Sequence, residues 1–316
     1  MADGEASDAL RSDKNLKAGP AWVAVDWGTT HLRLWLMGTD QEILDHRTSD
    51  RGMGSLQRHE FEPLLRDLLA DAMPGSGSLP VVCCGMVGAR QGWAEAPYVA
   101  CPCSPSAIDR AVEIEAANGR LSVFILPGVK QLDPPDVMRG EETQIAGLLA
   151  HSPDFSGAVC LPGTHSKWAN IEGGRIETFR TFMTGELFAL LSGQSILRHS
   201  VGGEELDEAA FSRAVTDALE NPATLTGELF SIRAATLLSD CAPPVSRARL
   251  SGLLIGAEIA GARAFWADQE TIVIGESALS KAYLNALSIA EAEARTMPGD
   301  GLTLSGLTAA FRNLKI

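Results

Sequence analysis

Two segments of this sequence place glycine and hydroxyl side chains at the turn after an apolar run. Asp26–Thr30 reads Asp-Trp-Gly-Thr-Thr, and Gly163–Ser166 reads Gly-Thr-His-Ser. Such a turn can present backbone N–H groups and side-chain donors to an anion. Either turn alone would also suit an ordinary hairpin. Together they predict a phosphate-bearing ligand, because a triphosphate held between two hairpins needs one turn from each.

Asp26 adds a carboxylate at the end of a buried apolar run. An isolated acid in that position is costly unless it meets a cation or water. Mg²⁺ would satisfy it, since this ion keeps several waters and shares phosphate oxygens. We therefore expect Asp26 to face a metal ion, through water.

A second pair of acids, Glu141 and Glu142, follows Gly140 at the start of a predicted helix over 141–150. A positioned carboxylate can take the proton of an alcohol as its oxygen bonds to phosphorus. Acids are also favoured in the first turn of any helix by the helix dipole. Both readings stay open from the residues alone.

Composition and missing motifs exclude several classes of protein. The chain has 26 Lys and Arg against 40 Asp and Glu, a net charge of −14, so a nucleic-acid partner is not expected. Neither a P-loop nor a G-x-G-x-x-G motif occurs, which disfavours those nucleotide folds. The six cysteines lack a matching set of zinc ligands.

The apolar pattern and the cysteines of the sequence indicate where the protein is located and how its N-terminal residues are interpreted. No run of 18 apolar residues exists, so no membrane span is expected. Residues 1–20 are polar, do not resemble a signal peptide, and are interpreted as a disordered leader. Cysteines without a signal peptide favour reduced thiols and a cytoplasmic location.

The pattern of apolar runs and turn residues predicts an α/β chain in two domains. Prolines between 127 and 135 suggest an N-terminal lobe over 21–135 and a C-terminal lobe over 136–316. A strand, a Gly-Thr turn and a second strand occur once in each lobe. Predicted strands are 22–27, 32–37, 79–84, 122–126, 158–161, 167–171, 175–182 and 271–274. Predicted helices are 61–72, 108–118, 141–150, most of 184–264, 277–294 and 302–314.

In order, these motifs resemble the superfamily of acetate and sugar kinases, heat-shock ATPases and actin. The resemblance implies two ribonuclease-H-like lobes, an actin-like ATPase fold, with a nucleotide cleft between them. Val273–Ser277 looks like the adenosine motif, and Gly252–Gly256 resembles the helix before it. The residues so assigned to ATP are Gly28, Thr29, Thr30, Gly163, Thr164, His165, Gly256, Gly275, Glu276 and Ser277.

Longer blocks resemble the 2-dehydro-3-deoxygalactonokinase family. They are Val25–Thr30, Gly85–Gly88, Gly92–Trp93, Ala96–Tyr98, Val137–Gln144 and Phe179–Leu187. This resemblance implies transfer of the ATP γ-phosphoryl group to the 6-hydroxyl of 2-dehydro-3-deoxy-D-galactonate, with Mg²⁺. In related carbohydrate kinases an acid after glycine at this helix start is the base. Glu141 occupies that position, where the usual residue is Asp, and Glu142 is the alternative.

A sugar-acid substrate needs a group that receives its carboxylate. Two loops of the N-terminal lobe, containing Arg51 with Gly52 and Gly88 with Arg90, are the candidates, and Trp93 could form a wall against the carbon chain. A solvated arginine and a core tryptophan are the alternatives.

Two other functions stay open from the sequence: a kinase of another sugar or sugar acid in the same superfamily, and a non-kinase protein that switches conformation on ATP. The expected partners are small molecules, ATP and a sugar acid. A homodimer is compatible with the sequence, although no motif indicates one.

Overall fold

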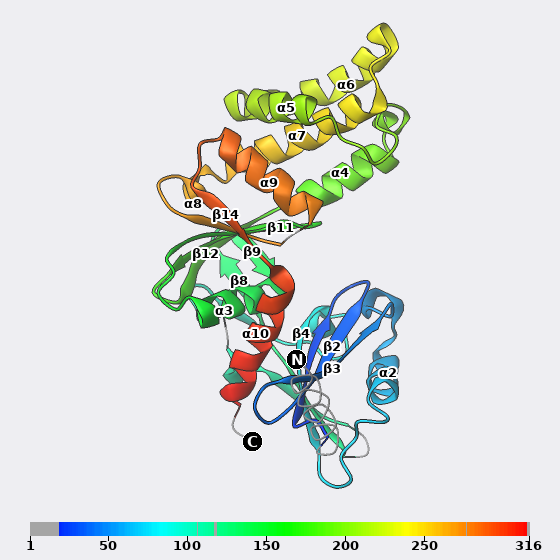
Figure 1. Cartoon of the computed structure of the whole chain (residues 1–316), viewed down its shortest axis with the longest axis vertical. Helices are drawn as coiled ribbons and strands as arrows, with labels where there is room; N and C mark the ends of the chain where they lie inside the picture. The colour runs from blue at the N-terminus through cyan, green and yellow to red at the C-terminus, as the bar shows by residue number, and fades with distance from the viewer. Residues whose placement is uncertain (1–18, 106, 117–118, 276, 315–316) are drawn as a thin grey trace, which may run out of the picture. The chain divides into compact units, whose positions relative to one another are not determined.

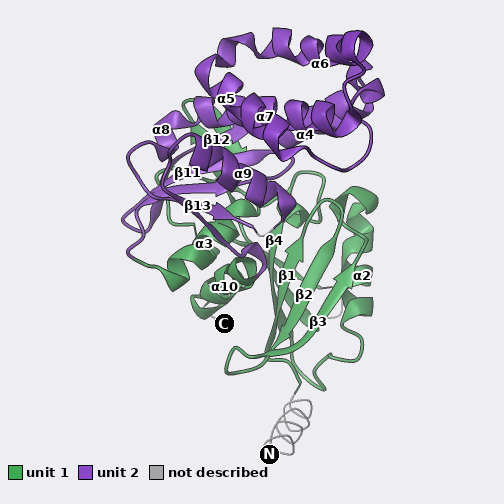
Figure 2. Cartoon of the chain, turned by 45° about the horizontal axis from the view of Figure 1, so that its top comes forward, with its two compact units in different colours: residues 1–153, 301–316 green, residues 154–300 purple. Residues whose placement is uncertain are grey.

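The computed structural model describes residues 19–105, 107–116, 119–275 and 277–314. Most of the predicted leader lies outside these residues. The chain divides into two compact units (Figure 2). The first contains residues up to 153 together with those from 301 onward, and the second is Asp154–Asp300.

The first unit is built on a six-stranded sheet of order β3-β2-β1-β4-β7-β6. β1 and β2 form the predicted antiparallel hairpin, while β4 and β7 continue the sheet in parallel with β1. β1 and β4 are almost wholly buried, as expected for central strands covered on both faces. Their bounds are β1 Trp22–Trp27, β2 Leu32–Met37, β3 Ile43–Ser49, β4 Leu79–Gly85, β6 Val112–Glu115 and β7 Leu121–Ile125.

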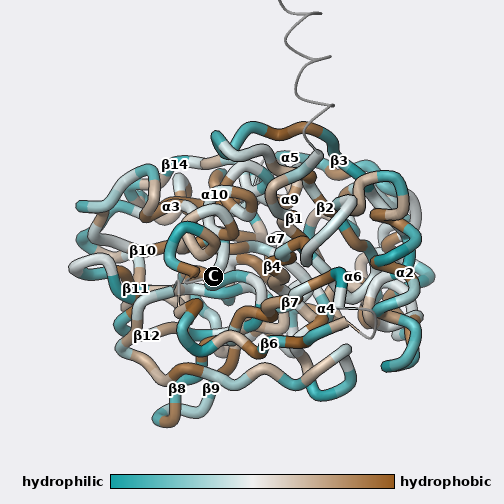
Figure 3. Tube along the Cα trace, turned by 90° about the horizontal axis from the view of Figure 1, so that it is seen from below, coloured by the Kyte–Doolittle hydropathy of each residue, from teal (hydrophilic) through white to brown (hydrophobic). Residues whose placement is uncertain are grey.

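Helices cover both faces of this sheet. α2 (Phe61–Leu68) contributes to the core on one face, and the C-terminal α10 (Gly299–Arg312) contributes to the core on the other. There Phe311 stacks on Trp22 with ring centroids 4.2 Å apart. Many of the loops at the periphery of the molecule consist of hydrophilic residues, which are coloured teal in Figure 3.

The C-terminal helix also explains where the compact units divide. α3 (Glu141–His151) and α10 approach so closely that a Cβ on Gly147 would collide with the backbone of Leu302. Both helices therefore pack with the first unit. The predicted division at 135/136 differs from this one by residues 136–153 and those from 301 onward, which contain α3 and most of α10. The contact between these two helices joins segments far apart in the sequence.

In the middle of the chain, one predicted helix is wrong and one small sheet was not predicted. The helix predicted over 108–118 is wrong: Ile108–Arg110 is a short 3₁₀ turn, and Val112–Glu115 is strand β6, antiparallel to β7. The Val-Glu-Ile-Glu alternation of β6 is a strand pattern. A small sheet of order β5-β8-β9 was also missed. Its strands are β5 Tyr98–Ala100, β8 Gly128–Leu132 and β9 Pro135–Met138.

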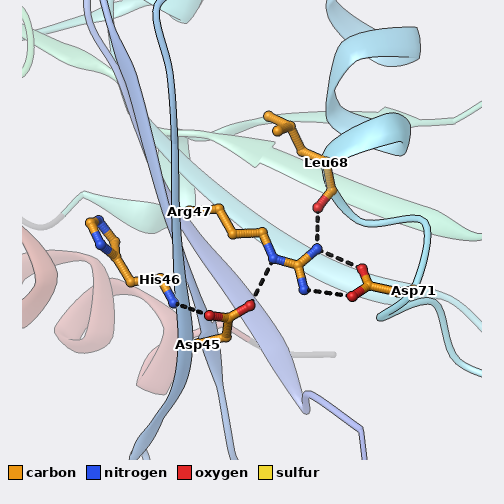
Figure 4. A network of polar contacts seen from close by, with 5 residues as sticks. All are labelled: Asp45, His46, Arg47, Leu68 and Asp71. Carbon is orange, nitrogen blue, oxygen red and sulfur yellow. Dashed lines mark hydrogen bonds and ion pairs between the residues drawn. The ribbon is translucent and has the colours of Figure 1, made fainter.

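At the edge of the first unit, Arg47 of β3 joins the sheet to the end of α2 (Figure 4). Its guanidinium pairs with Asp71 at 2.6 Å and with Asp45 at 2.8 Å, and it donates to the carbonyl of Leu68. Hydrogen bonding of the Arg47 guanidinium to the Asp71 carboxylate is the largest cause of the raised Arg47 pKa, and the same interaction lowers the pKa of Asp71.

The second unit repeats the sheet arrangement. Its order β12-β11-β10-β13-β14 has three antiparallel strands followed by two parallel ones, as in β3-β2-β1-β4-β7. The repeat confirms the predicted α/β fold with two ribonuclease-H-like units. Its strands are β10 Gly157–Leu161, β11 Ser166–Glu172, β12 Arg175–Phe182, β13 Thr271–Ile274 and β14 Ala294–Met297, the last of which was not predicted.

Helices make up the rest of the second unit, with α5 running along α7 (Figure 1). A Cβ on Gly252 would lie 2.6 Å from the carbonyl oxygen of Phe211 in α5, so small residues allow this close approach. The helices are α4 Thr184–Gly193, α5 Glu208–Glu220, α6 Leu225–Ser239, α7 Pro243–Gly261, α8 Arg263–Trp266 and α9 Ala278–Ile289. Within the described residues, no helix has the length and apolar character needed to cross a membrane.

Candidate active site

The first predicted phosphate turn lies between β1 and β2. Gly28 donates its N–H to His31 O at 2.9 Å, and the side chains of Thr29 and Thr30 are exposed. The turn borders an open hollow of about 510 Å³ that is also lined by Asp26 and Arg33. A ligand can therefore reach its hydroxyl groups and backbone.

The loop that contains Arg51 and Gly52 packs against this turn and is hydrogen-bonded to its backbone. Gly52 N donates to Thr30 O, and Gly54 N donates to Thr29 O, both at 2.9 Å. A Cβ on Gly52 would collide with the backbone of Thr29 and Thr30. The structure thus places Gly52 as a support of the turn, where sequence reasoning expected a substrate contact.

Asp26 has a protein partner for its charge. Arg33 Nη2 donates to Asp26 Oδ2 at 2.7 Å, and the Cys84 thiol lies 3.8 Å from Oδ1. No group of three His, Cys, Asp or Glu side chains in the described part of the chain could hold a metal by itself. Mg²⁺ needs less, since one or two carboxylates with waters and phosphate oxygens suffice. Asp26 fits that limited role.

The start of α3 holds the two candidate bases differently. Glu142 is 2% exposed; its Oε2 accepts from Gly140 N at 2.7 Å and its Oε1 from the Thr143 hydroxyl at 3.1 Å. Burial, followed by the neighbouring charge of Glu141, raises the Glu142 pKa to about 8. Glu141 is only partly buried, and its Oε2 accepts from Arg139 N at 3.0 Å. Glu141 is thus the more accessible carboxylate.

The end of β4 brings these carboxyl groups near the first turn. Gly140 has φ +110°, a conformation suited to glycine, and a Cβ there would lie 3.5 Å from Gly85 Cα. Burial raises the pKa of the Cys84 thiol, and the charges of Asp26 and Glu142 raise it further. Within the first unit, the predicted metal-facing acid and the start of α3 are therefore neighbours.

Sequence reasoning missed Arg139, which is 9% exposed. Its Nη2 donates to Ala96 O at 2.8 Å, and its guanidinium lies 4.3 Å from the ring centroid of Tyr98. A Cβ on Gly88 would lie 2.8 Å from Nη1, so Gly88 is required for packing. The sequence shows these residues in separate family-like blocks, and nothing in it indicates that the blocks meet around one arginine.

The other predicted substrate contacts have different surroundings. Trp93 lies in the hydrophobic core beside Trp27 and Phe61, with 8% exposure, which favours the alternative of a core tryptophan over a substrate wall. Arg51 pairs with Glu60 at 3.0 Å. Arg90 has an exposed side chain.

The second phosphate turn, between β10 and β11, is held by the start of α4. Glu186 N donates to Thr164 O at 2.9 Å, and Glu186 Oε2 lies 2.6 Å from His165 Nε2. A Cβ on Gly185 would collide with Gly163 O. The family-like block that contains Gly185 and Glu186, to which the sequence gave no role, therefore fixes this turn.

A pocket of about 460 Å³ opens beside the second turn, entirely within the second unit. Gly163 and Thr164 form one part of its wall, and helices α4, α7 and α9 form much of the rest. Apolar walls with a few polar groups are typical of small-molecule sites. The remaining lining residues are Thr184, Gly185, Phe188, Glu204, Leu206, Arg247, Ser251, Leu254, Ile255, Ala278, Leu279, Ala282 and Tyr283.

Gly256, Gly275 and Ser277, three of the predicted adenosine residues, are not among the residues that line this pocket. Gly256 faces α5, where a Cβ would lie 2.8 Å from Val215 O, so packing and not a ligand explains this glycine. Gly275 follows β13 with φ +132°, which glycine adopts readily. Ser277 caps α9 by accepting from Ser280 N at 3.3 Å. Glu276 lies outside the described residues.

Two ribonuclease-H-like units, each with a Gly-Thr turn after its first strand, define the α/β fold class of the sugar kinases and actin-like ATPases. The family model for 2-keto-3-deoxy-galactonokinase matches residues 26–310. The chain therefore belongs to the 2-keto-3-deoxy-galactonokinase family, whose members use ATP to phosphorylate an alcohol group.

Similar proteins agree with this membership over most of the chain. A Rhizobium meliloti (strain 1021) protein named "Probable 2-dehydro-3-deoxygalactonokinase" is 43% identical, covering 92% of this chain and 96% of its own length. The 2-dehydro-3-deoxygalactonokinase of Escherichia coli (strain K12) is 35% identical, covering 90% and 96%. A crystal structure of a Sinorhizobium meliloti protein assigned to the same kinases is 43% identical, with a TM-score of 0.87, covering 92% and 98%.

Proposed function

We propose that this protein transfers the γ-phosphoryl group of ATP to the 6-hydroxyl of 2-dehydro-3-deoxy-D-galactonate. The observation that carries the proposal is the second unit's pocket, which joins apolar walls to a phosphate turn held by α4. Family membership supports the choice of sugar acid. The alcohol acceptor agrees with an accessible carboxylate at the start of α3.

The nucleotide half of the proposal rests on shape and donors. The volume of about 460 Å³ lies in the usual range of small-ligand pockets, and its apolar residues suit a flat base. Gly163 and Thr164, with the N-terminus of α4 behind them, suit the phosphates, because helix N-termini favour anions. In the first unit, Gly28–Thr30 would contribute donors, and Asp26 would face Mg²⁺ through water. Bound Mg²⁺ would neutralise charge developing on the phosphate oxygens.

We assign the base to Glu141. Glu142 is almost fully buried, and both of its oxygens already accept hydrogen bonds. Glu141 is partly exposed at the first turn of the same helix. A general base typically contributes about 10²- to 10⁴-fold to the rate. Glu141→Gln should therefore lower kcat by roughly 100-fold or more while nucleotide binding is retained.

For the substrate carboxylate we favour Arg90. Arg51 already pairs with Glu60, while the Arg90 guanidinium is exposed and forms no ion pair among the residues that the structure describes. Arg90→Ala should raise KM for the sugar acid and leave KM for ATP unchanged. Arg51→Ala provides a matched comparison from the other predicted loop.

A substrate panel with an ADP readout tests the function. Purified protein with MgATP should release ADP with 2-dehydro-3-deoxy-D-galactonate and not with neutral hexoses. Including the C4 epimer, 2-dehydro-3-deoxy-D-gluconate, measures stereochemical preference. Slow ATP hydrolysis that no sugar acid stimulates would contradict the proposal and favour an ATP-dependent switch.

Two accompanying expectations concern the protein's surroundings. All six cysteines are free thiols in the structure, which fits a cytoplasmic location. A homodimer stays a prediction, and light scattering of the purified protein would test it.

A further inference from the structure

A buried carboxylate, that of Glu258, lies in the second unit beside the candidate nucleotide pocket. Glu258 of α7 is 2% exposed. Its Oε1 accepts from the indole N–H of Trp168 at 2.8 Å, and its Oε2 accepts from the Tyr283 hydroxyl at 2.7 Å. A carboxyl group is expensive to bury, so such a site needs several donors.

The donors come from three different elements. Ser166 and Trp168 lie on β11, Thr184 begins α4, and Tyr283 lies on α9. The Ser166 and Tyr283 hydroxyl oxygens are 2.8 Å apart, and Thr184 and Ser166 also hydrogen-bond Glu258. Burial raises the Glu258 pKa, while these hydrogen bonds act to lower it. One carboxyl group therefore ties β11, α4 and α9 to α7.

The same elements form the candidate nucleotide site. Thr184 and Tyr283 both line the pocket. Ser166 is the residue at which the second phosphate turn enters β11, and Thr184 directly precedes Gly185, which contacts Gly163. The Glu258 carboxyl group is thus hydrogen-bonded to a residue on each side of the contact between the phosphate turn and α4, and to Tyr283 of the α9 wall.

We propose that Glu258 is a positioning residue for the nucleotide. It fixes the second phosphate turn and the α9 wall in the arrangement that binds ATP, without contacting the nucleotide. This inference rests on the proposed function, since it concerns the pocket assigned to ATP there. If Glu258 had only a structural role, its hydrogen bonds would stabilise the second unit. Their loss would then not weaken nucleotide binding more than it weakens binding of the sugar acid.

Glu258→Gln and Tyr283→Phe test the proposal. Each preserves side-chain shape, and Tyr283→Phe removes two hydrogen bonds while keeping the ring in the pocket wall. We expect kcat/KM for ATP to fall between about 10-fold and about 100-fold in each variant. KM for the sugar acid should change by less than about twofold. Calorimetric titration with MgADP should show the same loss in nucleotide affinity.

A pair of tryptophan variants separates positioning from stability. Trp168→Phe removes the 2.8 Å hydrogen bond to Glu258, and Trp266→Phe removes a 2.8 Å hydrogen bond to Ile259 O in the same unit. Both are buried indole N–H bonds, so both variants should lose similar stability. Only Trp168→Phe should weaken MgADP binding.

Each result has a definite meaning. If Glu258→Gln does not fold, Tyr283→Phe and Trp168→Phe carry the test. If these variants bind MgADP as tightly as the unmodified protein, or no more weakly than Trp266→Phe, the positioning role is overturned and the proposed function stands. If the unmodified protein itself does not bind MgADP, the proposed function fails, and this inference fails with it.

Discussion

Glu142→Gln probes how α3 divides its two acids between structure and catalysis. The glutamine keeps the shape of the side chain, its amide oxygen can accept from Gly140 N, and its NH₂ group can donate to the Thr143 hydroxyl. The change therefore removes the titrating proton with little loss of packing or hydrogen bonding.

The magnitude follows from the shifted pKa. Burial raises the Glu142 pKa from 4.5 to about 8, so between these pH values the folded state binds more protons than the unfolded state. The free energy of unfolding therefore decreases as the pH rises through this window. Between pH 6 and pH 8, the two pKa values correspond to a loss of roughly 2 kcal/mol in the unmodified protein. The Glu142→Gln variant should not show this decrease in the free energy of unfolding, because a glutamine side chain does not titrate.

Urea unfolding followed by tryptophan fluorescence at pH 6 and pH 8 measures the effect. At pH 6 the variant should already be the more stable protein, because Glu142 of the unmodified protein is then neutral in the folded state but ionised in the unfolded state. The stability advantage of the variant should grow by roughly 2 kcal/mol between pH 6 and pH 8. A difference that does not change with pH would refute the account of Glu142 as a carboxyl group held neutral by burial.

Two glycine substitutions test the packing described for each unit. Gly88→Ala places a Cβ 2.8 Å from Arg139 Nη1 and should lower the free energy of unfolding by about 1–3 kcal/mol in urea titrations; an unchanged midpoint would show that the arginine can move aside. Gly185→Ala would push its Cβ against Gly163 O and should raise the MgADP dissociation constant by about tenfold or more in calorimetry. Gly193→Ala is its control in the same helix, since no atom lies within 4 Å of the added Cβ, and equal affinities for the two variants would contradict the role of α4.

The parts of the fold that sequence reasoning predicted correctly depend on local pattern. Both hairpins that carry the phosphate turns were predicted because an apolar run, a Gly-Thr turn and a second run are adjacent in the chain. Strand β6 was mistaken for a helix, although its alternation of apolar and acidic residues was visible. Local pattern could not predict that α10 returns to stack Phe311 on Trp22, because that contact joins the two ends of the chain.

The candidate site shows the same limit at the level of single residues. Residue type alone does not separate a tryptophan of a substrate wall from a core tryptophan such as Trp93. Gly256 was assigned to the nucleotide because it lies in the right motif, but its missing side chain makes room for α5. Arg139 and Glu258 were missed because their partners lie on several elements distant in the sequence.

We propose that this protein transfers a phosphoryl group from ATP to a sugar acid, with Glu141 as the base. The decisive experiment compares ADP release by the unmodified protein and by Glu141→Gln, with 2-dehydro-3-deoxy-D-galactonate as the acceptor. We expect rapid, sugar-dependent ADP release from the unmodified protein. In the variant, kcat should be lower by roughly 100-fold or more, while the affinity for MgADP should be the same. Full turnover by Glu141→Gln, or no sugar-dependent ADP release by the unmodified protein, would contradict the claim.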